Sequence, residues 1–343
     1  MLRTTTSLAL AGACALAISA GSASASDNPV ELRLAHWVPP THPIQVHGME
    51  QWAQSINEAS EGSITVTLYP AQQLGQANDH YDMARDGIAD IAFVNPGYQP
   101  GRFPVIAAGE LPFMVSNAKG GSAAIDSWYR EYAEQEMPDV KFCLMHLHSP
   151  GTFHSREPIR VPADISGMNV RPAHATMAAF ISEMGGQNFQ VSAPESRDAL
   201  ERGVADAITF PWNSILLFGI DAAVNYHLDM PFYATTFAWV MNQASYDNMS
   251  DNQRQVMDEH CTTEWAERVA TGWADEEDSG RGKLLEMEGH EGYAPTDEEV
   301  ALWREAAEPM RERWADAVRE AGHDPDKALS DLISELEERD SAY

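Results

Sequence analysis

The first hundred residues alternate between short strand-like patterns and longer helix-like patterns. Hydrophobic and polar positions alternate at 31–36 and 63–69, and a short apolar run stands at 91–94. Between these segments, apolar residues recur at helical spacing over 44–59 and 81–88. The order therefore predicts β-α-β-α-β. Such a unit forms a mostly parallel sheet with helices on both faces, and ligands bind at the carboxyl ends of its strands.

The same alternation starts again after residue 150. Strand and helix patterns follow one another at 168–171, 174–184, 188–191, 194–201 and 207–210. We therefore expect a second α/β domain, with chain crossings near Pro150 and Trp239.

These patterns predict an α/β fold of two lobes. Their expected bounds are 26–150 and about 239–265 for lobe I, and 151–238 and about 285–325 for lobe II. A helical stretch at about 251–288 exceeds the usual length of about 10–14 residues and can run across both lobes. The last helix is expected at 326–343.

The N-terminus has the three parts of a secretory signal. Arg3 is the basic start, an apolar run covers 8–18, and Ala23-Ser24-Ala25 supplies small residues for cleavage. The run is shorter than the ~20 residues of a membrane-spanning helix. We expect residues 1–25 to be a signal peptide, cleaved after Ala25, and the mature protein to be soluble.

Charge and cysteine content narrow the partners and the compartment. The 343 residues include 52 Asp and Glu against 22 Lys and Arg, a net charge of −30. This excludes a nucleic acid, whose binding needs clustered basic residues. The spread of acidic residues is typical of a solvated surface, in a protein of a salt-loving source or an ordinary secreted acidic one. Cys143 and Cys261 either form a disulfide in an oxidising compartment or remain two buried thiols.

No motif marks an enzyme or a metal centre. His146 and His148 lie two apart on an expected strand, but no cysteine or carboxylate at ligand spacing accompanies them. The sequence has no His-Glu-x-x-His, no G-x-S-x-G and no phosphate loop. We expect no catalytic residue, no metal and no cofactor. Two secreted lobes favour a hinge-closing solute receptor, and a secreted enzyme or a ligand sensor on the same fold is the alternative.

Four segments carry a resemblance to a known family: LYPAQQLG at 68–75, DGIAD at 86–90, PIRVPADISGMNVRP at 158–172 and ALERGVADA at 199–207. In this order they resemble the dicarboxylate-receptor-like solute-binding proteins of tripartite ATP-independent periplasmic (TRAP) transporters. The resemblance implies a two-lobed periplasmic receptor with a long helix across both lobes. It implies delivery of a small solute to membrane permease subunits, and we expect a monomer.

The resemblance also implies that Arg171, at the end of a G-x-x-x-R strand, holds a carboxylate. A planar charged fork suits bidentate binding of such a group.

The chain departs from the family pattern at positions that would contact the solute. Where sialic-acid-type relatives have a second arginine, this chain has Gly151 or, with a gap, Phe153. Phe210 replaces a polar contact and Trp212 follows it, while Trp37 stands where a polar residue follows the first strand. The predicted site has thus lost anion-binding side chains and gained aromatic faces.

His36, Asn95 and Tyr98, at the ends of predicted strands, complete the candidate ligand-binding residues. Aromatic faces suit an acid with a ring body or a small ammonium compound held by cation–π attraction. We expect a small amine or amino alcohol of the ethanolamine or choline type, with a small organic carboxylate close behind. A cation would also need a nearby carboxylate, for which Glu110 and Asp229 are candidates.

Overall fold

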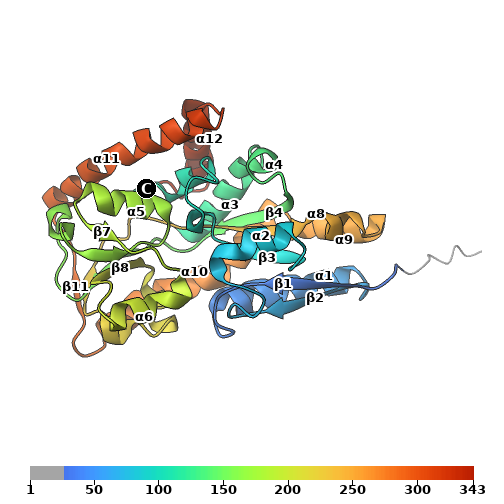
Figure 1. Cartoon of the computed structure of the whole chain (residues 1–343), viewed down its shortest axis with the longest axis horizontal. Helices are drawn as coiled ribbons and strands as arrows, with labels where there is room; N and C mark the ends of the chain where they lie inside the picture. The colour runs from blue at the N-terminus through green and yellow to red at the C-terminus, as the bar shows by residue number, and fades with distance from the viewer. Residues whose placement is uncertain (1–26) are drawn as a thin grey trace, which may run out of the picture.

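The computed structural model describes residues 27–343, which form two lobes around two separate sheets (Figure 1). The five-stranded sheet of lobe I has the order β2-β1-β3-β10-β4, with β1 (Val30–Ala35), β2 (Ile64–Tyr69), β3 (Ile91–Val94), β4 (Val140–Leu147) and β10 (Thr236–Asn242). The six-stranded sheet of lobe II has the order β11-β9-β5-β8-β6-β7, with β5 (Thr152–Ser155), β6 (Asn169–Arg171), β7 (Gln187–Asn188), β8 (Ala207–Phe210), β9 (Tyr226–Leu228) and β11 (Glu291–Tyr293). The predicted two-lobed α/β fold is confirmed, and the expected signal peptide lies outside the described residues.

The chain first crosses between the lobes at two connections between strands. The chain leaves lobe I after β4 and enters β5 of lobe II, then returns from β9 to β10. Strand β10 runs antiparallel to both β3 and β4. It begins at Thr236. The crossing was predicted near Trp239, so the chain enters the lobe I sheet slightly earlier than predicted. Every residue of β10 is buried, because the strand lies in the interior of the sheet.

Short helices cover the sheets. Those of lobe I are α1 (Glu50–Ala59), entered through a π-helical turn at Ile44–Met49, with α2 (His80–Arg85), α3 (Ala118–Tyr129), α4 (Ala133–Glu136) and α8 (Gln243–Asp247). Those of lobe II are α5 (Ala175–Glu183), α6 (Ser196–Glu201) and α7 (Trp212–Leu217). Helix α1 shows why the spacing predicted these elements: Trp52, Ala53 and Ile56 lie on one face and are buried.

The helix predicted at 251–288 is two helices, α9 (Asp251–His260) and α10 (Thr263–Leu285). The break lies at Cys261 and Thr262. Cys261 is bonded to Cys143 of β4, with Cα atoms 4.5 Å apart. Of the two states expected for these cysteines, the structure therefore shows the disulfide and not two buried thiols. The Thr262 side chain then accepts a hydrogen bond from the Trp265 N–H and caps a new helix. Helix α10 packs against α3 in lobe I and α7 in lobe II, which confirms a long helix across both lobes.

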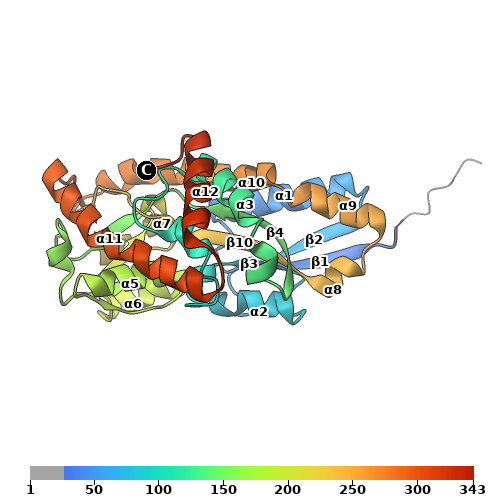
Figure 2. The same ribbon diagram turned by 90° about the horizontal axis from the view of Figure 1, so that it is seen from above.

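The C-terminal helices form a second bridge (Figure 2). Helix α11 (Asp297–Glu320) packs on α5 of lobe II, and near its end the Trp314 indole donates to the Val105 carbonyl of lobe I at 3.4 Å. Helix α12 (Pro325–Glu338) packs on α3 of lobe I. Within residues 27–343, no helix combines the length and the apolar composition needed to cross a membrane.

Candidate functional site

A narrow cleft lies between the lobes, at the carboxyl ends of strands from both sheets. The lining residues are Trp37, His42, Asn95, Tyr98, His148, Arg171, Ala173, Ala193, Phe210, Pro211, Ser214, Phe218, Thr235, Phe237 and Trp273.

Arg171, the last residue of β6, is buried in this cleft with 1% of its surface exposed. Its Nε donates to the Val191 carbonyl at 3.0 Å, and its Nη2 donates to the Tyr98 hydroxyl at 3.2 Å. Its Nη1 has no hydrogen-bond partner, and no described carboxylate forms an ion pair with it. A buried charge without a counter-ion costs several kcal/mol. The guanidinium therefore has no counter-ion unless an anionic group from outside the chain binds beside it.

Aromatic rings form the walls around Arg171. The Trp37 ring stacks on Phe93 at a centroid distance of 5.2 Å and leans on Tyr98 at 6.1 Å. From lobe II, the Phe210 ring lies 5.4 Å from the Arg171 guanidinium carbon. These faces suit a flat apolar body between the lobes.

The polar residues of the cleft are neutral apart from Arg171. Burial lowers the pKa of His42 to about 3 and that of His148 to about 4. His148 Nδ1 donates to the Ser149 carbonyl at 2.7 Å, so its Nε2 accepts from the Thr235 hydroxyl at 2.8 Å. Of the described residues that line the cleft, Arg171 alone carries a charge.

The two lobes touch each other beside the cleft. The Tyr98 hydroxyl of lobe I accepts from the Ala193 N–H of lobe II at 2.8 Å. Gly97 packs so closely that a Cβ at this position would lie 2.4 Å from the His174 Cβ. The structure is therefore a closed form, in which the backbone of the 95–101 loop lies against lobe II.

The structure brings five of the sequence-predicted residues together around the cleft: Trp37, Asn95, Tyr98, Arg171 and Phe210. This arrangement draws on both lobes and on both sets of strand ends.

Three predicted residues do not line the cleft. His36 follows the end of β1 and is fully buried. Phe153 lies in the lobe II core, 5.4 Å from Phe232 and 5.6 Å from Trp303. Trp212 packs edge-on against His154 at 5.1 Å.

Gly151, the other candidate position for the second arginine, leaves no room for a side chain. A Cβ there would lie 2.8 Å from the Phe210 carbonyl oxygen. The two carboxylates considered as partners for a cation are also absent from the lining. Glu110 bonds to Thr236 at 2.9 Å, and Asp229 pairs with Arg281 at 2.7 Å.

Sequence reasoning missed His42, His148, Thr235, Phe237 and Trp273. His42 follows a Pro-rich loop after the first strand, a position that could have indicated a strand-end site. Trp273 belongs to the apolar pattern of a long helix, which does not say which lobe or cleft a given side chain faces.

A second hollow lies between the 96–107 loop and helices α5 and α11. Its arginine, Arg313, pairs with Glu183 at 2.6 Å, so it contains no comparable unpaired charge. Within residues 27–343, no group of three or more His, Cys, Asp or Glu side chains is arranged to hold a metal ion. We take the inter-lobe cleft as the candidate site.

Comparison with protein families gives a match over most of the chain. The model of DctP, bacterial extracellular solute-binding protein family 7, matches residues 34–317. A curated solute-binding protein of Chromohalobacter salexigens is 22% identical over 252 residues, which cover 72% of this chain and 74% of the relative.

Solved TRAP solute-binding proteins share the fold. One from Rhodoferax ferrireducens, in complex with copurified benzoate, has a TM-score of 0.85 and 26% identity, covering 91% of this chain and 98% of its own. Another from Bordetella bronchiseptica, with bound (R)- and (S)-mandelate, has a TM-score of 0.85 and 28% identity, covering 90% and 99%. A protein of Chromohalobacter salexigens with bound D-glucuronate has a TM-score of 0.77 at 19% identity, over 89% and 99%, and is similar in fold.

Proposed function

The chain belongs to the DctP family of TRAP solute-binding proteins, and we propose that its solute is a small aromatic monocarboxylate. Members of this family are periplasmic receptors that bind small solutes and deliver them to membrane permease components. The proposal adds the chemical class of the solute to that family function.

Arg171 is the observation that carries the proposal. Its guanidinium is buried in the cleft, with an unpartnered Nη1 and no carboxylate from the described chain beside it. A ligand carboxylate would supply the missing counter-charge and accept from Nη1 and from the Tyr98 hydroxyl. The aromatic walls would then hold a ring attached to that carboxylate.

The ligands of two similar structures support the same class. Benzoate and mandelate are both single-ring monocarboxylates, and the two proteins that hold them share 26% and 28% of their residues with this chain.

The amine or amino alcohol expected from the aromatic residues has less support. An ammonium group in this cleft would meet the Arg171 charge at close range. Neither Glu110 nor Asp229 lines the cleft to offset that repulsion. The small carboxylate, which was the second expectation, is the better match to the site.

We also propose that the receptor acts as a monomer. Both lobes belong to the same chain, so residues of one copy stand on both sides of the cleft. Sedimentation at several protein concentrations, with and without benzoate, would give one mass throughout if this is correct.

Titration calorimetry with benzoate, mandelate, ethanolamine and choline tests the solute class. We expect the two acids to bind and the two amines to give no heat. Arg171→Gln should weaken acid binding by about 2–5 kcal/mol, at least about 30-fold in Kd, because a buried carboxylate loses its only cationic partner. The same variant should keep or raise the Tm of the ligand-free protein, because it removes an uncompensated buried charge.

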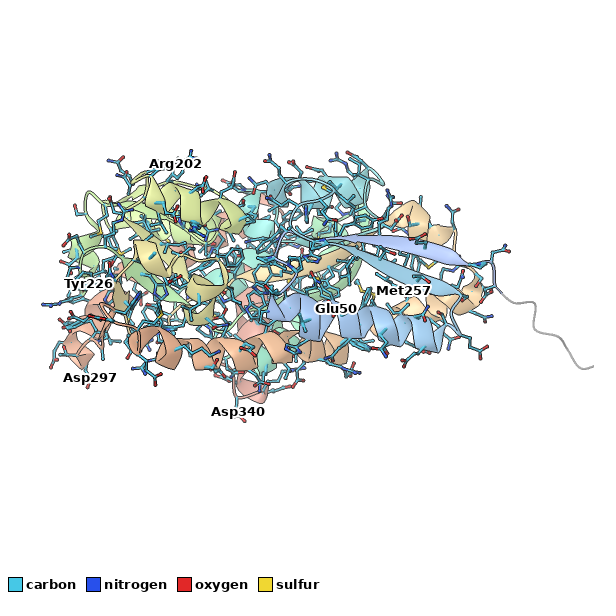
Figure 3. All side chains as sticks on the ribbon, turned by 90° about the horizontal axis from the view of Figure 1, so that it is seen from below. Glu50, Arg202, Tyr226, Met257, Asp297 and Asp340 are labelled. Carbon is cyan, nitrogen blue, oxygen red and sulfur yellow. A yellow bond between two sulfur atoms is a disulfide. The ribbon has the colours of Figure 1, made fainter. Side chains whose placement is uncertain are left out.

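Arg202→Gln is the matched control, since Arg202 lies at the surface of lobe II (Figure 3) with 75% of its side chain exposed. The affinity of the Arg202→Gln variant for the two acids should equal that of the wild type. Binding of choline but not of benzoate by the wild type would contradict the proposal, and so would an Arg171→Gln variant that binds benzoate as tightly as the wild type.

A further inference from the structure

The cleft contains more hydrogen-bond donors than a single carboxylate can satisfy. On the lobe II side, Arg171 Nη1 is one unpaired donor. On the lobe I side, the indole Nε1–H of Trp37 is buried and has no partner. An indole nitrogen only donates, so it needs an acceptor from outside the protein.

His42 adds a second donor on the lobe I side. Its Nδ1 accepts from the Ile44 N–H at 3.2 Å, so the proton of the neutral ring must be on Nε2. Burial lowers the pKa of the ring to about 3, which keeps it neutral at physiological pH. The T-shaped contact with the Trp273 ring, at a centroid distance of 4.9 Å, holds the imidazole in the cleft wall.

The 95–101 loop supplies two more donors. Asn95 Oδ1 accepts from the Gly97 N–H at 3.0 Å, which leaves the amide hydrogens on Nδ2 free to donate. The Tyr98 oxygen accepts from both Ala193 and Arg171, so its own proton remains to be donated. Tyr98 and Asn95 both belong to lobe I, but Tyr98 bonds to Arg171 of lobe II and Asn95 does not.

We propose that lobe I recognises a second oxygen of the solute through Trp37 Nε1–H and His42 Nε2–H, since a neutral oxygen has two lone pairs to accept hydrogen bonds. The solute is then an aromatic monocarboxylate with an additional uncharged oxygen, as a hydroxyl or a keto group. This inference rests on the proposed function, because it takes the first carboxylate to be held by Arg171.

The second group is uncharged because the lobe I side of the cleft has no cation. A second carboxylate there would be buried against neutral donors, at a much higher desolvation cost than a hydroxyl or a ketone. The Thr235 oxygen, which donates its proton to His148, can accept the hydrogen of a ligand hydroxyl.

Ligands of nearly equal size test this assignment without any change to the protein. Phenylacetate, mandelate and phenylglyoxylate differ by the oxygen on the carbon next to the carboxylate. We expect mandelate and phenylglyoxylate to bind the wild type at least about tenfold more tightly than phenylacetate in titration calorimetry, because the deoxy acid leaves buried donors unpaired.

His42→Phe and Trp37→Phe remove one donor each and keep an aromatic ring. In each variant we expect the affinity ratio of mandelate to phenylacetate to fall towards one. The ratio is measured within one variant, so a general loss of stability does not mimic the effect. If His42→Phe does not fold, Trp37→Phe and the three wild-type titrations still decide the question. His260→Phe is the control, because His260 is a buried histidine that bonds to Val256 and Ser55 outside the cleft.

Equal wild-type affinities for the three acids would overturn the inference, as would an unchanged ratio in both variants. Tighter binding of phthalate isomers than of mandelate would show that the second group is charged. If benzoate and phenylacetate bind through Arg171 and the ratio is one, the second-oxygen inference fails alone. If no aromatic acid binds, the proposed function itself fails.

Discussion

Glu110 and His174 meet between the lobes, where burial raises the pKa of Glu110 and lowers that of His174. Their Oε2 and Nδ1 atoms are 3.2 Å apart. His174 Nδ1 also accepts from the Met177 N–H at the start of α5, so it holds no proton of its own. A hydrogen bond between the two side chains would therefore need its proton on Glu110. Burial supports this state, because it raises the pKa of Glu110 to about 7.

The stability contribution of Glu110 should therefore depend on pH in a defined direction. Its pKa is about 7 in the folded protein and 4.5 for an ordinary glutamate. The folded state thus binds more protons than the unfolded state in this range. The contribution is complete below the lower pKa and is lost as the pH rises through the higher one.

Glu110→Gln mimics the protonated side chain and cannot titrate. We expect the Tm of the variant minus that of the wild type to increase between about pH 5 and about pH 8. Glu183→Gln, at an exposed pair with Arg313, should show no such trend. Parallel Tm curves for wild type and Glu110→Gln would mean that Glu110 is ionised throughout.

Helix α10 holds α7 in place and so shapes one wall of the cleft. Pro211 provides no side-chain cap for α7. Instead, the buried Glu277 of α10 accepts from the Asn213 N–H at 2.6 Å and the Ser214 N–H at 3.2 Å. Further along α10, at Gly280, the backbones of α10 and α7 come into close contact. A Cβ on Gly280 would lie 2.3 Å from the Asn213 nitrogen.

Two glycines of α10 should therefore respond in opposite ways to alanine. Gly280→Ala forces backbone apart and should lower the free energy of unfolding by about 1–3 kcal/mol. Gly282→Ala meets no atom within 4 Å, so it should raise the free energy by about 0.5–1 kcal/mol through higher helix propensity. Urea unfolding of both variants measures the two changes. If the free energy of unfolding changed in the same direction in both variants, this would contradict the close contact between α10 and α7.

The charge of the whole molecule opposes its compact state. The chain has 52 acidic and 22 basic residues, a net charge of −30. Several ion pairs, such as Arg202 with Asp198 and Arg319 with Asp316, lie at the exposed surface and contribute little individually. Long-range repulsion among the remaining carboxylates is therefore a whole-molecule term that depends on salt.

We expect the Tm to rise between about 0.05 M and about 1 M sodium chloride, because the screening length falls from about 14 Å to about 3 Å. Scanning calorimetry at several salt concentrations gives the dependence. Potassium chloride should produce the same rise, since screening does not depend on the identity of the cation. A constant Tm would show that the acidic residues are too far apart, or too well paired, to repel one another.

The sequence by itself determined most of the elements, the two-lobed class and the family of this protein. Strand and helix periodicity is local, so 31–36 and 44–59 could be predicted without their partners. Arg171 was found because a continuous motif surrounds it, and Trp37, Asn95, Tyr98 and Phe210 because they stand at strand ends.

Tertiary structure alone decided which side chains face the cleft and in which chemical state. The sequence does not distinguish Phe153 from His42 as a candidate site residue, yet Phe153 packs in the lobe II core and His42 lines the site. Cys261, in the break before α10, is bonded to a residue 118 positions away in the sequence. The unpaired donors of Trp37 and Arg171 exist only because the lobes close around them. Contacts between distant segments set the direction, partner and protonation of a side chain, and no local pattern contains that information.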